Sequence, residues 1–195
     1  MSLQNKQPES KQLLAKYWAT GKKFHAKTSS FIKKYNNKII VIKYGGYALT
    51  KPALLKSFAK NISLLNQLGI KVIVVHGGGP QIEKELKKRK INNEEYQGLR
   101  VTTKSVLGVV KRILSHDLNK LISDEIKKNG GKTKRLNGVS TKVLKAKIAM
   151  NGNIGFVGEP RGIDKNIIMK ALKSNHIPII APLGVDANNN TLNIN

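Results

Sequence analysis

Two glycine clusters and one lysine are the residues of this chain whose types and spacing suggest chemistry. Gly45 and Gly46 follow the apolar run IIVIKY, and the triplet 77–79 follows the apolar run KVIVV. Glycine has no Cβ, so a ligand can approach the neighbouring backbone N–H groups closely. Where such a turn opens a helix, the helix N-terminus adds a partial positive charge. The two clusters therefore predict a site for anions.

Lys43 lies within the first apolar run, two residues before Gly45. A lysine in a buried strand is costly to desolvate unless an anion pairs with it. The alternative is a lysine that reaches solvent from the end of a strand. The glycine patterns are neither GxGxxG nor GxxxxGK[ST], so neither the dinucleotide fingerprint nor the Walker loop applies.

The elements that must position these residues alternate along the chain. Buried strands are predicted at 38–44 and 71–75, and helices at 52–68 and from Pro80 onward. Strand, helix, strand, helix is the order of a βαβ unit with a parallel sheet, where ligands gather at the carboxyl ends of the strands. Both glycine clusters fall at such ends.

The remaining patterns complete an α/β fold with a mostly parallel central sheet between layers of helices. In chain order they predict a hairpin or extended loop at 91–102, one or two helices at 103–129, strands at 132–136, 141–148 and 154–157, a helix from a cap at Asp164 to about Asn175, a buried strand at 177–182, and a hairpin in the last twelve residues.

Composition and charge exclude several kinds of site and make specific nucleic-acid binding less favoured. The 195 residues contain no cysteine, which excludes disulfides and thiolate metal sites, and no apolar run is long enough for a membrane span. The formal charge is +25, yet only five of the 36 basic residues are Arg, and the lysines are spread along the chain. Because nucleic-acid-binding faces usually concentrate Arg and aromatic residues, a solvated basic surface is favoured over specific nucleic-acid binding. We expect a cytoplasmic protein.

The first 27 residues are predicted to form a separate helical arm. Residues 11–27 place Leu13, Leu14, Tyr17 and Trp18 at helical spacing, and the pattern restarts at 28–30, which are good N-cap types. Such an amphipathic arm suits packing on a partner. Its Ser- and Lys-rich character leaves organellar import as a minor alternative, although it contains no Arg. Residues 28–195 then form one lobe.

Six segments carry a family resemblance. VIKYGG, VVHGGGPQI, GLRVT (98–102), GFVGEP (155–160), IPIIAPLGVD (177–186) and the terminal NIN resemble the N-acetylglutamate kinases, a branch of the amino-acid kinase family. The segments follow the family's order from about residue 26 to residue 195. Lys-x-Gly-Gly and the glycine triplet are shared across the wider family, whereas HGGGPQI together with GLRVT is more specific to this branch.

The resemblance implies transfer of the γ-phosphoryl group of ATP, with Mg²⁺ arriving on the ATP, to the side-chain carboxylate of N-acetyl-L-glutamate in arginine biosynthesis. A carboxylate with a pKa near 4.3 is already ionised at neutral pH, so the reaction needs no general base. By motif, Lys43 would bridge the phosphoryl oxygens, and Gly45 and Gly46 would hold the β- and γ-phosphates.

The same resemblance implies the residues that bind the acceptor substrate. Gly78 and Gly79 would hold acetylglutamate through backbone N–H groups. Arg100 of GLRVT would pair with the α-carboxylate, since its planar fork meets a carboxylate with two hydrogen bonds. Asn193 would contact the amide or a carboxylate of the substrate. No metal-binding residues are expected.

The family pattern continues NIN with Ala-Asp, whereas this chain stops at Asn195. The resemblance places a second catalytic lysine and the adenine-binding lobe in that further part, so we expect a fragment that is inactive alone. It also implies a homodimer, or a hexamer assembled through the N-terminal arm. Two smaller departures are Tyr96-Gln97 before GLRVT, where the family more often has Asn before Gly, and the lack of an acid in 132–142.

Two alternatives remain open. The chain could be another amino-acid kinase acting on aspartate or glutamate, which GLRVT argues against. It could instead be a non-catalytic basic remnant that binds nucleic acid or a partner protein, in which case binding would be sensitive to salt and indifferent to Lys43 and Arg100.

Overall fold

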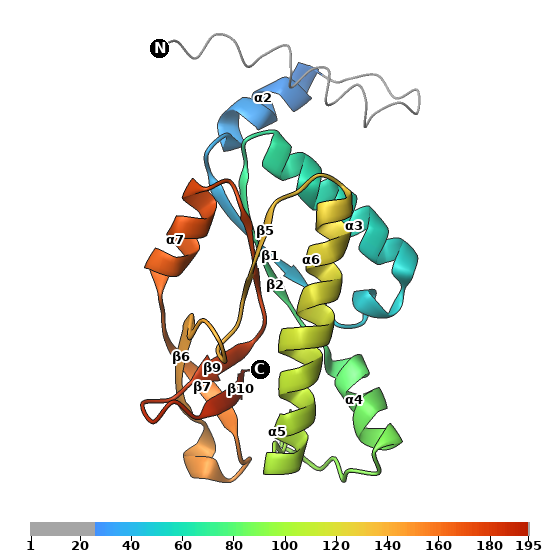
Figure 1. Cartoon of the computed structure of the whole chain (residues 1–195), viewed down its shortest axis with the longest axis vertical. Coiled ribbons are helices and arrows are strands. Elements are labelled where there is room, and N and C mark those ends of the chain that lie inside the picture. The colour runs from blue at the N-terminus through green and yellow to red at the C-terminus, as the bar shows by residue number, and fades with distance from the viewer. Residues whose placement is uncertain (1–25, 195) are drawn as a thin grey trace.

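The computed structural model describes residues 26–194, and the predicted arm before residue 26 lies outside this range. The first described element, α2, is Ala26–Tyr35. It continues through residues 28–30, so the prediction that a helix is capped there is wrong. These residues are the third to fifth of the described helix, whereas a capping residue would precede its first residue. Figure 1 shows α2 at one end of the molecule, above the sheet.

A parallel four-stranded sheet forms the centre of the fold, as the βαβ pattern predicts (Figure 1). The strand order is β1-β2-β8-β5, and every neighbouring pair is parallel. The bounds are β1 Ile39–Tyr44, β2 Lys71–His76, β5 Thr133–Leu136 and β8 Ile177–Ile180.

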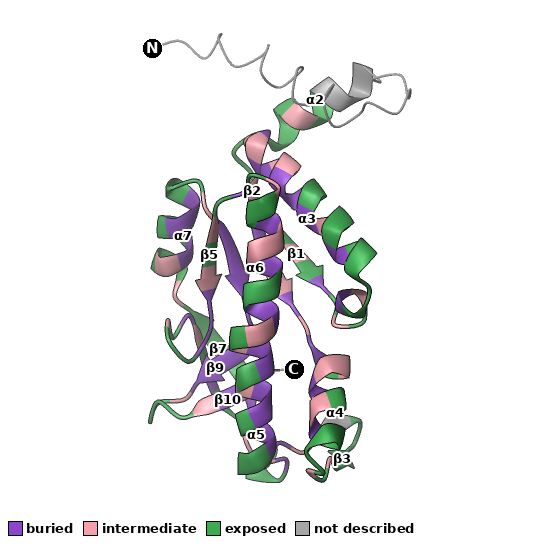
Figure 2. Ribbon diagram, turned by 45° about the vertical axis from the view of Figure 1, so that its right-hand side comes forward, coloured by how far each residue is buried: buried purple, intermediate pink, exposed green. Residues whose placement is uncertain are grey.

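Helices cover both faces of this sheet (Figure 2). Their bounds are α3 Pro52–Gln67, α4 Gly79–Lys88, α5 Lys104–Lys111, a π-helical segment η3 Arg112–Leu118, α6 Asn119–Lys128 and α7 Lys165–Lys173. Segments α5, η3 and α6 form one long continuous helix, as predicted for 103–129. The predicted cap of α7 is confirmed, because the Asp164 carboxylate accepts hydrogen bonds from the N–H groups of Asn166 and Ile167.

Alternation along β2 divides the apolar core between the two faces. Val72 and Val74, fully buried, pack with α3 and α6. Ile73, between them, points to the other face and packs against Ile168 and Leu172 of α7. This period of two is what a strand covered on both sides requires.

Strand β1 differs from its prediction as a buried strand, because it lies at the edge of the sheet. Its side chains alternate: Ile40 and Ile42 pack on the core, whereas Ile39 and Val41 are 45% and 63% exposed. Lys43 follows on the exposed face. The desolvation argument for an anion beside Lys43 therefore fails, since this lysine is not buried.

The last third of the chain builds a second, closed sheet of four short strands beside one end of the parallel sheet (Figure 1). The order is β10-β7-β6-β9, with β6 Leu144–Ile148, β7 Val157–Ile163, β9 Leu183–Val185 and β10 Thr191–Ile194. The hairpin predicted at the end of the chain is β9 and β10.

Three strand predictions in this region have the wrong bounds. The strand predicted at 141–148 begins only at Leu144, after a turn in which Lys142 has a φ of +50°. The strand predicted at 154–157 begins only at Val157, because Gly155 has a φ of +67° and turns the chain before it. The strand predicted at 177–182 ends at Ile180, and the chain passes through Pro182 into β9. Short elements complete the fold: η2 Ala48–Thr50, β3 Glu95–Tyr96, β4 Leu99–Arg100 and η4 Met150–Gly152. Within 26–194, no helix is long and apolar enough to cross a bilayer.

Candidate anion-binding pocket

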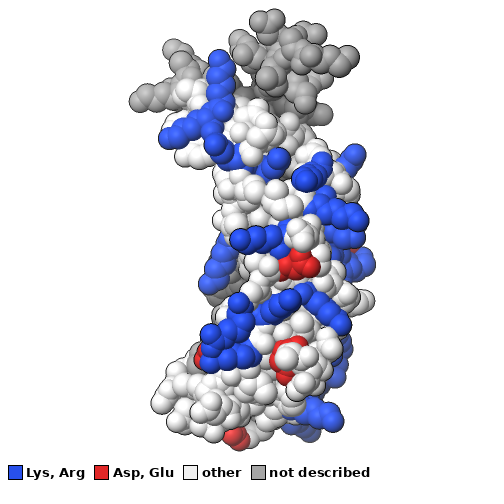
Figure 3. Space-filling model, turned by 90° about the vertical axis from the view of Figure 1, so that its left-hand side faces the viewer, with Lys and Arg blue, Asp and Glu red and all other residues white. Residues whose placement is uncertain are grey.

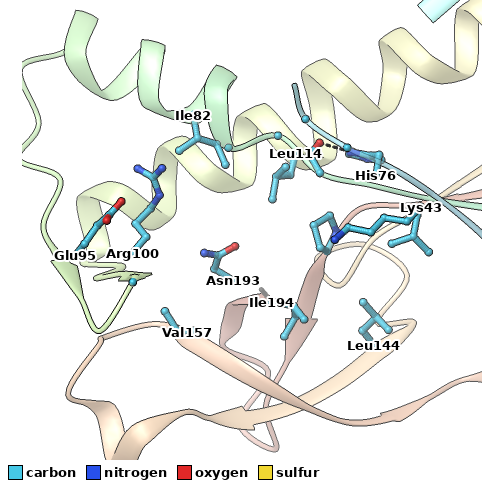
Figure 4. Close-up of a pocket in the computed structure, with 18 residues that line it drawn as sticks. Lys43, His76, Ile82, Glu95, Arg100, Leu114, Leu144, Val157, Asn193 and Ile194 are labelled. Atoms are coloured by element: carbon cyan, nitrogen blue, oxygen red, sulfur yellow. Dashed lines mark hydrogen bonds between the residues drawn. The ribbon is translucent and has the colours of Figure 1, made fainter. Parts of the chain in front are cut away.

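A pocket of about 700 Å³ opens at the carboxyl ends of β1 and β2, between the start of α4, the β3–β4 hairpin and strand β10 (Figure 4). All seven residues predicted to form the site line this pocket: Lys43, Gly45, Gly46, Gly78, Gly79, Arg100 and Asn193. The structure therefore brings together residues that are up to 150 positions apart in the sequence.

Close packing accounts for three of the glycines, two of them at the contact between the two glycine loops. A Cβ on Gly46 would lie 2.8 Å from the backbone nitrogen of Gly78, and one on Gly77 would lie 3.1 Å from the nitrogen of Gly46. A Cβ on Gly78 would lie within 2.7 Å of methyl groups of Leu114 and Leu118. Packing within the fold therefore disfavours a side chain at 46, 77 and 78, most strongly at 46, where the opposing atoms are backbone.

Gly45 and Gly79 have no such packing reason. A Cβ at either position would meet no atom within 4 Å, and neither residue has a positive φ. Both line the pocket, and Gly79 is the first residue of α4, where unpaired N–H groups and the helix dipole favour an anion. Here the absence of a side chain leaves the backbone open to a ligand.

Gln81 connects the loops and was not recognised from the sequence. Its Nε2 donates to the carbonyl oxygen of Gly46 at 3.0 Å, which ties the first loop to helix α4. Its Oε1 is buried and accepts no hydrogen bond from any residue in 26–194. The sequence signal was its place in the HGGGPQI segment, two residues after the triplet.

The β3–β4 hairpin brings Arg100 to the pocket. Gln97 and Gly98 both have positive φ, as a two-residue type I′ turn requires. Left-handed φ is easier for Asn than for Gln, which explains the family's preference at position 97. The Arg100 Nη1 donates to Oδ1 of Asn93 at 2.6 Å. Glu95, the cross-strand neighbour of Arg100, also lines the pocket and was missed because nothing in its sequence context marks it.

Asn193 joins three of the segments that the sequence analysis singled out. Its Nδ2 donates to Oγ1 of Thr102 at 3.3 Å, and Thr102 is fully buried. The Thr102 carbonyl accepts from the N–H of Phe156 at 2.8 Å, and a Cβ on Gly155 would lie 2.3 Å from that same oxygen. GLRVT, GFVGEP and NIN are therefore packed against one another at the edge of the pocket.

The positive side chains approach the pocket from opposite ends. Figure 4 shows Lys43 on one side and Arg100 on the other, with Asn193 between them. Glu95 is the single acidic side chain among the pocket residues that the structure describes. An elongated ligand with a negative charge at each end matches this arrangement.

His76, the last residue of β2, lies beneath the glycine triplet and is 1% exposed. Burial lowers the pKa of its imidazole, and the hydrogen bond between Nδ1 and the Gly77 carbonyl oxygen opposes this only in part. A neutral ring that fixes the turn agrees with the interpretation from sequence. Throughout 26–194, no group of three His, Asp or Glu side chains is arranged to hold a metal ion.

Known proteins resemble this chain over most of its length. Residues 38–195 match the Amino acid kinase family. The acetylglutamate kinase of Psychrobacter cryohalolentis is 41% identical over 176 residues, a match covering 85% of this chain and 59% of that protein. The acetylglutamate kinase of Campylobacter curvus is 40% identical over 165 residues, with the same coverage. The chain thus spans about three fifths of these relatives.

Two solved structures resemble the fold. The crystal structure of smu.665 from Streptococcus mutans UA159 superposes with a TM-score of 0.70 at 30% identity, covering 80% of this chain and 63% of that one. An N-acetylglutamate synthase from Neisseria gonorrhoeae superposes with a TM-score of 0.73 at 20% identity, covering 86% of this chain and 38% of that one. The second likeness concerns the fold alone.

Proposed function

Because the chain belongs to the amino acid kinase family, we propose that its pocket binds N-acetyl-L-glutamate and presents the side-chain carboxylate for phosphorylation. The observation that carries the proposal is the pair of cations, Lys43 and Arg100, at opposite ends of a pocket walled by glycine backbone (Figure 4). N-Acetyl-L-glutamate has a carboxylate at each end and a neutral acetamido group on the carbon next to the α-carboxylate. The relatives at about 40% identity are acetylglutamate kinases, which supports the same substrate.

In this proposal Arg100 binds the α-carboxylate through its guanidinium fork, and the hydrogen bond to Asn93 keeps the fork in place. Asn193, fixed by Thr102, hydrogen-bonds the acetamido group. The N–H groups of Gly78 and Gly79 complete the binding of the acceptor. The side-chain carboxylate then points toward Lys43.

The amino acid kinase family uses ATP, which supplies the γ-phosphoryl group. We propose that Gly45 and Gly46 hold its phosphates through backbone N–H groups, which the open space at Gly45 permits. Lys43 neutralises negative charge on the transferring oxygens. Positioning and positive charge are the main requirements of phosphoryl transfer to an acceptor that is already ionised. Mg²⁺ would be held by the phosphates of ATP.

We propose further that residues 28–195 act as the substrate-binding lobe, and that turnover requires the part of the enzyme that matches the remaining two fifths of the relatives. We also propose that the protein is cytoplasmic and that it forms a homodimer, or a hexamer assembled through the arm at 1–27. Figure 3 shows basic side chains spread along most of one face, which favours a solvated surface over a nucleic-acid site.

Isothermal titration calorimetry of the 195-residue chain tests the substrate. We expect saturable binding of N-acetyl-L-glutamate, and binding at least tenfold weaker for L-glutamate and L-aspartate, since neither carries the acetyl group. Arg100→Lys should weaken binding by about tenfold, because lysine cannot form the bidentate contact. Arg161→Lys is the matched control, since Arg161 is 56% exposed and lies outside the pocket.

Equal affinity for the three ligands would contradict the assigned substrate and favour another amino-acid kinase. A chain that binds none of them but binds nucleic acid in a salt-dependent way, with no effect of Lys43→Ala, would favour the basic remnant.

A further inference from the structure

A chain of buried and partly buried hydrogen bonds connects the glycine triplet to the far edge of the sheet. The Nδ1 of His76 lies 3.0 Å from the Gly77 carbonyl oxygen, and its Nε2 lies 3.2 Å from Nδ2 of Asn119. The Oδ1 of Asn119 accepts from Nε of Arg135 at 3.0 Å, and Nη2 of Arg135 donates to the Ser115 carbonyl at 2.8 Å. These five groups come from β2 and the residue that follows it, and from α6, β5 and η3, so the network links four elements of the fold.

The donors in this network can be assigned without ambiguity. Arginine only donates, so the Asn119 oxygen must face Arg135. The Asn119 amide nitrogen then faces His76 and also donates to the Ile179 carbonyl at 2.9 Å. Both of its hydrogens are used, so Nε2 of His76 must accept. The imidazole proton is therefore on Nδ1, from which it is donated to Gly77.

This proton fixes the peptide between Gly77 and Gly78. No peptide bond in the described chain is cis, and in a trans peptide the N–H points opposite to the preceding C=O. Because the Gly77 carbonyl faces His76, as the dashed line in Figure 4 shows, the Gly78 N–H points away from the ring. No residue in 26–194 accepts a hydrogen bond from that N–H.

The helix that carries Asn119 also packs on the triplet. Leu114 and Leu118 lie in the π-helical segment, and their methyl groups would be 2.7 and 2.6 Å from a Cβ on Gly78. Segments of π-helix occur frequently at functional sites. Asn119 is the first residue after this segment. The same part of the helix therefore supplies the leucines that pack on Gly78 and the amide that hydrogen-bonds His76 beside the glycine triplet.

We propose that Asn119, oriented by Arg135, is a positioning residue that fixes the His76 ring and through it aims the Gly78 N–H at the bound substrate. The inference rests on the proposed function, in which that N–H binds acetylglutamate. Asn119 touches neither the substrate nor the reacting atoms in this account. It acts two hydrogen bonds away, and the pocket residues alone do not reveal it.

The first experiment needs no ligand. Long-range ¹H–¹⁵N NMR distinguishes the two neutral tautomers of histidine, and loss of one signal in His76→Gln identifies His76 among the four histidines. We expect the Nδ1–H form in the wild-type chain. In Asn119→Asp, which keeps the shape of the side chain and its contact with Arg135, a carboxylate faces Nε2 and the ring should become doubly protonated. An Nε2–H tautomer in the wild-type chain would overturn the proposal.

The second experiment measures the consequence for binding. Asn119→Ala should weaken N-acetyl-L-glutamate binding on the order of tenfold, which is the contribution expected from one hydrogen bond to a charged group. It should also shift the Gly78 amide resonance. Asn66→Ala is the matched control: Asn66 is buried, its Nδ2 donates to Asn175 at 3.1 Å, and it lies outside the pocket. It should lower the thermal midpoint but leave affinity and the Gly78 resonance unchanged.

Equal loss of affinity in both variants, or unchanged affinity in Asn119→Ala, would show that Asn119 has only a structural role. If Asn119→Ala does not fold, Asn119→Asp provides the same comparison. If the wild-type chain binds no acetylglutamate, the proposed function fails, yet the His76 tautomer and the Gly78 resonance in Asn119→Asp still decide whether Asn119 positions the loop.

Discussion

The adjacent glycines 78 and 79 should respond in opposite ways to alanine substitution. A Cβ on Gly78 would lie 2.6 Å from Cδ1 of Leu118 and 2.7 Å from Cδ2 of Leu114, well inside the contact distance of about 3.5–4.0 Å between carbon atoms. Both leucines are at most 5% exposed, so neither can rotate into solvent. Overpacking of this kind costs about 1–3 kcal/mol.

A Cβ on Gly79 would meet no atom within 4 Å, and the residue begins helix α4 with a backbone that alanine can adopt. Gly79→Ala should therefore leave stability unchanged or raise it by about 0.4–1 kcal/mol, because alanine has less conformational entropy to lose on folding. The new methyl group would, however, occupy the pocket.

Thermal unfolding followed by circular dichroism measures the difference, since 1 kcal/mol shifts the midpoint by about 2–4 °C in a domain of this size. We expect a lower midpoint for Gly78→Ala only. Calorimetry should show weaker acetylglutamate binding for Gly79→Ala at undiminished stability. A Gly79→Ala midpoint that falls as far as that of Gly78→Ala would refute the claim that packing disfavours a side chain at 78 but not at 79.

Three further predictions concern single side chains. Asp164→Ala should lower the free energy of unfolding by about 1 kcal/mol in urea titrations, because α7 loses its cap; no change would contradict the capping role. Lys43→Ala should leave the unfolding midpoint unchanged because Lys43 is exposed, but it should weaken acetylglutamate binding in calorimetry because Lys43 lines the pocket. A lower midpoint would instead indicate a structural role. His76 is neutral in the folded chain, with a pKa lowered by burial, whereas unfolding lets it bind a proton below about pH 6.5. Stability should therefore fall as the pH decreases from about 6.5 toward the folded pKa, with a slope of up to about 1.4 kcal/mol per pH unit. In urea titrations across this range, His76→Gln should lose that slope and the control His116→Gln, at an exposed site, should keep it.

The sequence was most informative where one local pattern decides the outcome. The parallel sheet, the long helix and the cap at Asp164 follow from periodicity and capping chemistry, and the structure has all of them. The seven site residues also came from motifs in fixed order, and they line one pocket. Their individual roles remain proposals.

What the sequence could not provide depends on contacts between distant segments. An apolar run does not reveal whether a strand lies in the centre or at the edge of a sheet, so the exposure of Lys43 was missed. Which glycines are required by packing depends on what Leu114 and Leu118 occupy, more than 30 residues away. The network through Asn119 and Arg135 likewise joins positions that no local pattern connects.

The central claim is that the backbone N–H groups of Gly78 and Gly79 bind acetylglutamate between Lys43 and Arg100. The most direct measurement is a titration of the ¹⁵N-labelled chain with N-acetyl-L-glutamate, followed residue by residue in ¹H–¹⁵N correlation spectra. The account predicts saturable shifts concentrated at Gly78, Gly79 and the hairpin that carries Arg100, with amides of α7 unmoved. Shifts that avoid Gly78 and Gly79, or that spread evenly over the lysine-rich surface, would contradict it.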